Sequence, residues 1–320
     1  MPENPRRERP PARESSVLDP DTQAEPEARA SETRSHHGTL GSMSTTIGVV
    51  GTGNMGSALV RGWLRSPEPG VRLLLWDKIT PLALGSLTSS RVSQASSLDD
   101  LVANADVIFV VVKPKDAQEV LGAISCLIRE DQAIVSCMAG VSLEWMRTVL
   151  GPRPALFRIM PNLGVELGVG AVAVAAEPNT SAATVQAVMA LLQSLGLAEL
   201  GSESMLDALA AVSGTGPAFL ALAMEGLEDG AVKVGLTRPL ARTFVRQTAL
   251  ATAGLLALCS DSPARLREHV AMLSDVDAAG TDILEDRDVR LAFRQAVEAA
   301  MERSRHLQEA NPLPGPAPDV

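Results

Sequence analysis

The chain has 320 residues, of which 46% are hydrophobic and 2% aromatic, and its 28 basic against 38 acidic side chains give a formal net charge of −10 at pH 7. Nucleic-acid binding is disfavoured, because phosphate contacts need clustered lysine and arginine and base stacking needs aromatic side chains. No uninterrupted apolar run reaches the roughly 18 residues of a membrane span, and the three cysteines lack metal-ligand spacing, so we expect no membrane partner, no metal and a cytoplasmic location.

Residues 1–42 differ in composition from the rest of the chain. They hold six prolines and mixed charges but scarcely any large apolar side chain, so they cannot bury enough surface to offset their chain entropy. We expect a disordered N-terminal extension here, rather than a secretory signal or a transit peptide. Met43, which opens the first apolar pattern, is an alternative start of the protein. The proline-rich residues 311–320 are expected to form a loose tail.

Between Thr45 and Gly201, short apolar runs alternate with helical patterns. This alternation predicts an α/β domain, with a doubly wound parallel sheet covered by helices on both faces. The predicted strands cover 46–51, 71–76, 106–112, 132–137, 155–159, 170–175 and 197–200. The predicted helices cover 54–65, 98–104, 116–129, 142–150 and 181–195.

After Gly201 the pattern is helical throughout. Helices are predicted from 203 to 259, with breaks at Gly214–Pro217 and Gly235–Pro239, and again over 263–272 and 289–309. Thr237 is a suitable N-cap because Pro239 follows just inside the next helix. The helices over 216–233 and 239–259 are apolar nearly all round, which indicates burial within a bundle or against another subunit. At roughly 150 residues per domain, we divide the chain into 43–201 and an all-α domain, 202–310.

A glycine-rich segment follows the first predicted strand and opens the first predicted helix. Its G-x-G-x-x-G pattern is typical of dinucleotide-binding Rossmann domains, which assigns that role to residues 43–201. Gly51 allows the tight turn, Gly53 lets the backbone approach a pyrophosphate, and Gly56 lets helix and strand pack closely. The helix N-terminus offers free N–H groups to the phosphates. The candidate cofactor-binding residues of this segment are Gly51, Thr52, Gly53, Asn54, Met55 and Gly56.

The second predicted strand ends in Trp76-Asp77-Lys78. An acidic residue about 20 positions beyond the last glycine usually binds the ribose 2′-hydroxyl, so Asp77 favours NAD. Lys78 could instead pair with a 2′-phosphate, which favours NADP. Both residues are cofactor-binding candidates, and the sequence leaves NADPH and NADH open.

Five further motifs follow in order. They are Val111-Val112-Lys113-Pro114, Ser136-Cys137-Met138-Ala139-Gly140-Val141, Arg158-Ile159-Met160-Pro161-Asn162, Glu203-x-Met205-x-Asp207-Ala208 and Ser213-Gly214-Thr215-Gly216-Pro217-Ala218-Phe219. With this order and spacing, the chain from about Thr45 to Leu307 resembles the pyrroline-5-carboxylate reductase family.

The resemblance implies an NAD(P)H-dependent oxidoreductase that reduces the C=N bond of Δ1-pyrroline-5-carboxylate to form L-proline, in proline biosynthesis. It also implies a helical dimerisation domain that intertwines with its twin and often assembles further. The nicotinamide side would be lined by Val111, Val112, Lys113, Pro114, Cys137, Met138 and Ala139. Ser213 and Thr215 would lie on the substrate side, at the start of a helix at the dimer interface.

The chain departs from the family in its substrate region. A threonine usual in the family is replaced by Ala210, so one hydroxyl that could bond the imine nitrogen is missing. The family loop V-T-S-P-G-G-x-T is not preserved after Val270, and its match is limited to Gly280 and Thr281, which with the following Asp282 are the candidate substrate-binding residues. Three aspartates, at 275, 277 and 282, bring negative charge to this region, unless they face solvent or Asp277 caps a helix over 278–286.

Two alternatives stay open besides the family reaction. An aspartate in the pocket would favour a different imine, and an intact nucleotide loop with an altered substrate loop would also suit a non-catalytic NAD(P)-binding dimer. The β-hydroxyacid dehydrogenases share the glycine pattern but need a lysine on an interdomain helix, and residues 203–232 contain none.

Overall fold

The structure, a computed structural model, describes residues 45–66, 70–79, 89–259, 262–272 and 275–310. These residues fall in one unit, Thr39–Val320. The predictions for residues 1–42 and 311–320 lie outside the described residues.

A sheet of eight strands forms the first half, in the order β3-β2-β1-β4-β5-β6-β7-β8. Its central strands are continuous apolar runs, because a strand covered by helices on both faces has no solvent side. The strands are β1 (Thr45–Val50), β2 (Val71–Trp76), β3 (Val92–Gln94), β4 (Val107–Val110), β5 (Ala133–Ser136), β6 (Ala155–Pro161), β7 (Gly170–Ala176) and β8 (Gly196–Leu200). This confirms the predicted doubly wound α/β domain.

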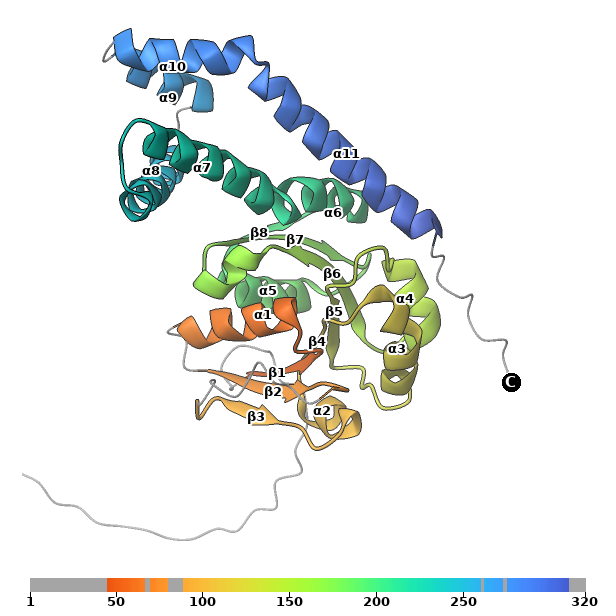
Figure 1. Ribbon diagram of the computed structural model, residues 1–320. Coiled ribbons are helices and arrows are strands. Elements are labelled where there is room, and N and C mark those ends of the chain that lie inside the picture. Colours follow the sequence, from red (N-terminus) through yellow and green to blue (C-terminus); the bar gives the residue numbers. More distant parts are fainter. Residues whose placement is uncertain (1–44, 67–69, 80–88, 260–261, 273–274, 311–320) are drawn as a thin grey trace, which may run out of the picture. The chain divides into compact units, whose positions relative to one another are not determined.

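Helices cover both faces of this sheet (Figure 1). One buried apolar cluster joins α1 and α5 to the sheet, and a second joins α2, α3 and α4 to its other face. The helical elements of this half are α1 (Asn54–Arg65), α2 (Leu98–Asn104), η1 (Pro114–Asp116), α3 (Ala117–Ser125), α4 (Leu143–Leu150), η2 (Leu163–Leu167) and α5 (Ala182–Gln193).

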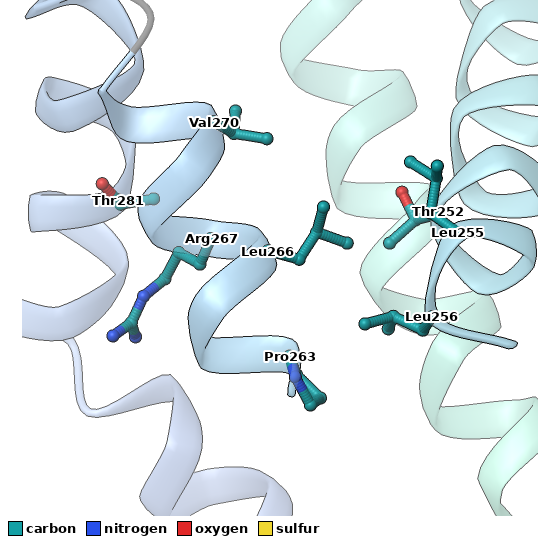
Figure 2. Close-up of a pocket in the computed structure, with 8 residues that line it drawn as sticks. All are labelled: Thr252, Leu255, Leu256, Pro263, Leu266, Arg267, Val270 and Thr281. Carbon is teal, nitrogen blue, oxygen red and sulfur yellow. The ribbon is translucent and has the colours of Figure 1, made fainter. Parts of the chain in front are cut away.

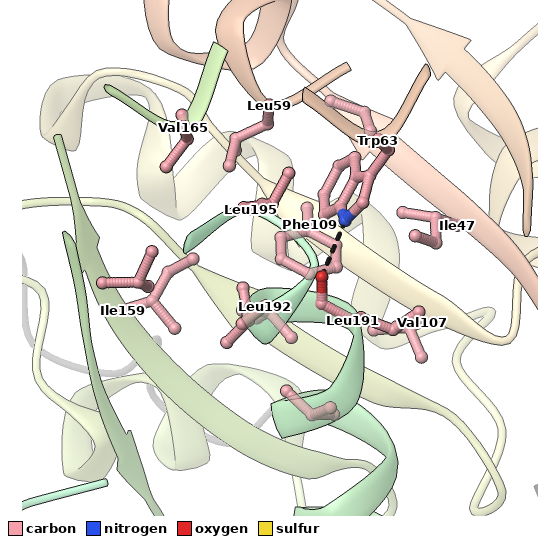
Figure 3. Packing of buried hydrophobic residues seen from close by; sticks show 14 of the residues in the cluster. Ile47, Leu59, Trp63, Val107, Phe109, Ile159, Val165, Leu191, Leu192 and Leu195 are labelled. Carbon is pink, nitrogen blue, oxygen red and sulfur yellow. Dashed lines mark hydrogen bonds between the residues drawn. The ribbon is translucent and has the colours of Figure 1, made fainter. Parts of the chain in front are cut away.

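Trp63 holds α1 in the centre of the first cluster (Figure 3). Its ring meets Phe109 edge to face, with the ring centroids 4.8 Å apart. Its Nε1–H donates a 2.9 Å hydrogen bond to the carbonyl of Leu191 on α5, so this buried polar group is satisfied. The packing fixes α1, and therefore the glycine-rich turn that precedes it.

Two features of the sheet differ from the prediction. The strand β7 pairs antiparallel with β6, because the short segment between Pro161 and Gly170, which holds only η2, is too brief for a parallel crossover of a dozen or more residues. The edge strand β3 was missed, since Val92 is the only apolar residue among its three.

The described elements after Leu200 are all helical. They are α6 (Glu203–Leu209), the π-helix η3 (Ala210–Gly214), α7 (Gly216–Lys233), α8 (Arg238–Leu258), α9 (Pro263–Ala271), α10 (Asp275–Asp286) and α11 (Val289–Ala310). Thr237 is the N-cap residue of α8, as predicted, and Pro217 and Pro239 lie in the first turns of α7 and α8.

The long helices α7 and α8 leave their apolar side chains uncovered in the single chain. None of the residues of α7 is buried, and only Ala241 is buried on α8. The helical stretch Glu203–Lys233 is long and apolar enough to cross a membrane by length and composition alone. The sequence predicted that these helices are buried either within a bundle or against another subunit. Among the described residues, no surrounding bundle covers them.

Candidate active site

The predicted cofactor residues gather at the carboxyl ends of four parallel strands. The strands β1 and β4 are neighbours, and the chain leaves β1 toward β2 on one side and continues from β4 to β5 on the other. In open α/β sheets this reversal of strand order opens a crevice that receives ligands. The loops after β1, β2, β4 and β5 therefore meet at one edge.

The glycine-rich turn depends on close backbone contacts. Gly51 has a φ of +96°, and a Cβ there would lie 2.5 Å from the carbonyl oxygen of Val111. A Cβ on Gly56 would lie 2.0 Å from the oxygen of Gly51. The Ser57 hydroxyl donates a 2.7 Å bond to the Thr52 carbonyl. Gly51 and Gly56 are therefore required by close contacts within the protein itself, and not by a ligand.

Gly53 is different, because a Cβ there would meet nothing within 4 Å. It is the N-cap residue of α1, where no side chain caps the helix and the first turn holds no acidic residue. Serine side chains do cap α2, α4, α5 and α9. The exposed N-terminus of α1 thus has both the space and the uncapped N–H groups that a pyrophosphate requires.

Asp77 is bonded to the same turn from the end of β2. Its Oδ2 accepts hydrogen bonds from the Thr52 amide, at 2.6 Å, and from the Thr52 hydroxyl, at 2.8 Å. Its Oδ1 accepts one from the Ile79 amide at 3.0 Å. Burial raises the pKa of Asp77, but these bonds, with one from the Lys78 amide, outweigh it and hold the pKa below its ordinary value.

The exposed side chain of Lys78 does not bond the glycine-rich turn but pairs with a residue of α3. Its Nζ lies 2.7 Å from Oε1 of Glu119 on α3. The hydrogen bond and the charge of Glu119 raise the pKa of Lys78, with a further contribution from the charge of Asp116. Glu119 is a residue that the sequence analysis did not single out, because its helix follows β4 and only the folded sheet brings it beside β2.

The nicotinamide-side candidates extend this edge. The amide of Val111 donates to Val50 at 2.8 Å, and the amide of Cys137 donates to Val110 at 3.0 Å, so both loops continue the ladder from β1. Lys113, Pro114 and Ala139 are exposed, whereas Met138 is buried. The structure brings the two loops to the glycine turn, and their contact with nicotinamide stays a prediction.

Cys137 should react more slowly than Cys126. Burial raises the pKa of its thiol well above the ordinary range, so its thiolate fraction is small at neutral pH. Cys126, at the end of α3, is exposed. In a Cys259→Ser variant at pH 8, we expect iodoacetamide to label Cys126 at least tenfold faster than Cys137, as followed by peptide mass spectrometry. Equal rates would contradict the raised pKa of Cys137 and its lower exposure.

Ser213 and Thr215 lie at the junction of the π-helix and α7. The Ser213 hydroxyl donates to the Leu209 carbonyl at 2.9 Å, and the Thr215 hydroxyl donates to the Ala211 carbonyl. Both side chains are half-buried and keep lone pairs as acceptors. A π-bulge of this kind is frequent at functional sites.

A buried arginine connects the sheet to the first of these helices. Arg158 on β6 bonds Glu203 Oε1 at 3.1 Å and Asp207 Oδ1 at 3.0 Å, both on α6. Glu203 Oε1 also accepts the Leu143 amide at 2.9 Å. Arg158, Glu203 and Asp207 belong to motifs named in the sequence analysis, which assigned them no role.

Gly280, Thr281 and Asp282 lie within α10, away from any loop. Thr281 lines a cavity of about 290 Å³ formed by α8, α9 and α10. Figure 2 shows Leu266 facing Leu256 across it, while Arg267 points away. The guanidinium of Arg267 is paired with Glu285 at 2.6 Å. The cavity walls are thus mostly apolar, and the three residues predicted to bind substrate lie on a helix.

One prediction in this region is wrong. The helix begins at Asp275, so Asp277 lies in its first turn and does not cap a helix that begins at 278. Asp282 is exposed. The side chains of Asp275 and Asp277 are not among those that the structure describes.

Comparisons with known proteins agree with this fold. Residues 203–307 match the family model for pyrroline-5-carboxylate reductase dimerisation, and residues 46–140 match the model for NADP oxidoreductase, coenzyme F420-dependent. Pyrroline-5-carboxylate reductase 3 of Danio rerio is 33% identical over 82% of this chain and 91% of its own length. The pyrroline-5-carboxylate reductase of Pseudomonas aeruginosa is 32% identical over 83% of this chain and 98% of its own.

The chain belongs to the pyrroline-5-carboxylate reductase family. Among solved structures, the Plasmodium falciparum pyrroline carboxylate reductase with NADP bound superposes with a TM-score of 0.72 at 26% identity, over 83% of this chain and all of that one. The Streptococcus pyogenes 1-pyrroline-5-carboxylate reductase gives a TM-score of 0.70 at 27% identity, over 82% of this chain and 98% of that one.

Family membership accounts for the exposed apolar helices. The stretch Glu203–Lys233 falls inside the region that matches the reductase dimerisation model. Its uncovered side chains are therefore those of a homo-oligomeric reductase, and the alternative of a membrane span has only length and composition in its favour. Burial against another subunit was one of the two alternatives that the sequence analysis gave for these helices, the other being burial within a bundle.

Proposed function

We propose that this chain catalyses the reduction of Δ1-pyrroline-5-carboxylate to L-proline with NADH or NADPH. The observation that carries the proposal is the glycine-rich turn at the switch point of the sheet, with an uncapped helix N-terminus and open space over Gly53, in a chain of this family. The lysine required by the β-hydroxyacid dehydrogenases is absent from residues 203–232.

The bound dinucleotide supplies hydride from C4 of its nicotinamide to the imine carbon. The chain's own contribution is to hold the two reacting carbons together and keep water away. An imine that enters protonated is already electrophilic, so the site needs no strong acid or metal. The pyrophosphate would lie over residues 51–56, and Val111–Pro114 with Cys137–Ala139 would flank the nicotinamide.

On the substrate side, we assign contact roles to Ser213 and Thr215 at the start of α7. Their hydroxyl protons are engaged by helix carbonyls, so each would serve the substrate as an acceptor, including of an iminium N–H. Gly280, Thr281 and Asp282 would lie on the substrate side only through the partner subunit or a rearranged α10.

We further assign residues 43–201 to nucleotide binding and 202–310 to dimerisation and substrate binding. The active form would be a homodimer or a higher homo-oligomer, in the cytoplasm, without nucleic-acid or membrane partners. The acidic composition and the scarcity of aromatic residues argue against a nucleic-acid partner.

A second candidate is the reduction of a different cyclic imine. Two observations favour it: Ala210 supplies no hydroxyl at the π-helix, and Arg267, the cationic side chain among the residues that line the cavity, is paired with Glu285. A substrate without a carboxylate, or with an additional amine, would not need an anion site there.

The experiment is a steady-state assay of the purified full chain. NADH or NADPH oxidation is followed at 340 nm with Δ1-pyrroline-5-carboxylate, with the uncharged 1-pyrroline, and without imine. Turnover dependent on the carboxylate supports the proposal. Faster turnover of 1-pyrroline supports the second candidate. Dinucleotide binding with no oxidation of either cofactor would overturn both and leave a non-catalytic binding protein.

A further inference from the structure

We propose that Glu203 is a positioning residue for hydride transfer, which sets the distance between the loop beside the nicotinamide and the helix that carries Ser213. The inference rests on the proposed function, because it concerns the two sides of that site. Hydride transfer needs the reacting carbons within about 3 to 3.5 Å of each other, and a misplacement of about 1 Å can cost roughly a hundredfold in rate. A residue that fixes the two sides against each other acts on this rate without touching substrate or cofactor.

The loop on the nicotinamide side is held at both ends. It covers residues 137–142, between β5 and α4, and the bond from the Cys137 amide to the Val110 carbonyl fixes its start. It ends at Leu143, the first residue of α4, whose amide has no partner within its own helix. Glu203 Oε1 accepts this amide at 2.9 Å. A carboxylate of α6 therefore caps α4, where negative charge is favoured, and fixes the end of the loop.

The same oxygen fixes α6 to the sheet. Glu203 Oε1 also accepts Arg158 Nη1 at 3.1 Å, and Asp207, one turn further along α6, accepts Arg158 Nη2 at 3.0 Å. Because the guanidinium is a rigid planar fork, it holds two successive turns of α6 and fixes the rotation of this helix about its axis. In the sheet register, Arg158 pairs with Ser136, the last residue of β5. The anchor of α6 thus lies level with the start of the nicotinamide loop.

Helix α6 transmits this placement to the substrate side. The helical stretch Glu203–Lys233 runs through α6, η3 and α7. The Ser213 hydroxyl donates to the carbonyl of Leu209, the last residue of α6, so this hydroxyl is tied directly to the anchored helix. One carboxylate oxygen therefore joins the nicotinamide loop to the helix that carries the substrate-side hydroxyl.

A second arginine–carboxylate pair offers a matched control at the opposite edge of the sheet. Arg147 on α4 donates to both oxygens of Glu177. Glu177 follows the antiparallel β7, and its amide donates to the Leu156 carbonyl near the start of β6. The Glu177 side chain is 24% exposed, against 31% for Glu203. This pair also ties a helix to the sheet, but at the ends of the strands that carry no predicted site residue.

The test is steady-state imine reduction by the full chain, with kcat expressed per dinucleotide site, as titrated by quenching of tryptophan fluorescence. Glu203→Asp keeps the charge but shortens the side chain by about 1.5 Å, so it cannot bond Leu143 and Arg158 together. We expect kcat per site to fall at least tenfold, while dinucleotide affinity changes less than threefold. Glu203→Gln keeps the length and the acceptor oxygen, and its kcat per site should stay within threefold of wild type.

A merely structural role for Glu203 predicts a different result. A less stable Glu203→Asp protein would have fewer dinucleotide sites but an unchanged kcat per site, and this outcome would overturn the inference. A slower Glu203→Gln than Glu203→Asp would also overturn it, because the charge would then matter more than the position. Glu177→Asp should leave kcat per site unchanged. An equal loss in that control would make the effect one of general loosening of the sheet and overturn the inference.

A second pair of variants tests the same bond from the other side, should Glu203→Asp fold poorly. Proline suits the first position of a helix, and Ser142 already has the extended backbone, with a ψ of 157°, that a residue before proline prefers. Leu143→Pro therefore removes the N–H donor and leaves the pairing of Glu203 with Arg158. Leu143→Val has the same number of side-chain carbons and keeps the donor. We expect kcat per site to be at least fivefold lower for Leu143→Pro than for Leu143→Val, and equal values would overturn the inference.

Failure of this inference can be told apart from failure of the proposed function. A wild type that reduces neither Δ1-pyrroline-5-carboxylate nor 1-pyrroline overturns the function, and the inference with it. A wild type that reduces the imine, with Glu203→Asp and Leu143→Pro equally fast per site, overturns the inference alone.

Discussion

Replacing Gly53 by alanine should remove most dinucleotide binding and leave the fold intact, whereas the same change at Gly56 should destabilise the protein. A methyl group on Gly53 meets nothing within 4 Å, and its φ of −62° is open to any residue. It would occupy the space that a pyrophosphate needs. We expect NADH affinity to fall about a hundredfold, or about 2.7 kcal/mol, with the unfolding free energy within about 1 kcal/mol of wild type.

The Gly56 methyl would instead collide with the backbone oxygen of Gly51 at 2.0 Å. Because α1 is fixed by the Trp63 contacts, the clash must be relieved by moving the helix from the sheet, at a cost of about 3 kcal/mol. The control is Gly122→Ala on α3, where there is open space and alanine should stabilise by about 0.5–1 kcal/mol. Urea unfolding and NADH titration measure both effects. A destabilised Gly53→Ala protein would contradict this account of the turn.

Arg158→Met should destabilise the protein by about 3 kcal/mol, because it leaves two carboxylates without their partner. The arginine side chain is 4% exposed, and Glu203 and Asp207 are 31% and 25% exposed. Removing one member of a buried ion network costs more than the network contributes over an apolar replacement. The loss should show as a lower urea midpoint, and the connection of α6 to the sheet should be the first to open.

Two variants test the cause of that loss. Combining Arg158→Met with Glu203→Gln and Asp207→Asn removes the stranded charges and should recover at least half of the stability. The control is Asp229→Asn, which breaks the exposed pair with Arg238 and should cost less than about 1 kcal/mol. If Arg158→Met alone stays within 1 kcal/mol of wild type, the network does not hold α6 to the sheet.

Local patterns predicted the elements whose ends carry their own signals. The helices over 54–65, 98–104 and 216–233 have the predicted bounds, because a glycine, a serine cap and a proline mark their starts. The strand β3, of three residues, is recognised only by its pairing with β2. The antiparallel direction of β7 follows from the length of its connection to β6. The pattern within a single segment contains neither kind of information. Residues 275–286 form a helix, close to the helix over 278–286 that the sequence analysis kept as the alternative to a family loop.

The nucleotide edge was predicted more fully than the substrate side. Residues 51 and 77 were assigned from the glycine-rich motif and its spacing, and residues 111 and 137 from the family resemblance. The folded sheet then brings all four to one edge, because the carboxyl ends of parallel strands meet there. The bonds from Thr52 to Asp77, and the pairing of Lys78 with Glu119, depend on loop geometry in three dimensions. On the substrate side, Ser213 lies in a π-helix, which the sequence analysis did not predict, and Thr281 lies in α10, which begins three residues earlier than the helix considered there.

The uncovered helices α7 and α8 have a thermodynamic consequence. A chain in which Leu222 and Phe244 are 69% and 62% exposed cannot stabilise these helices by its own core, so their apolar burial arises only when two chains meet. The folding equilibrium of the C-terminal half is then bimolecular and obeys mass action. Dilution alone would expose that half to unfolding while the sheet domain, with its internal core, stays folded.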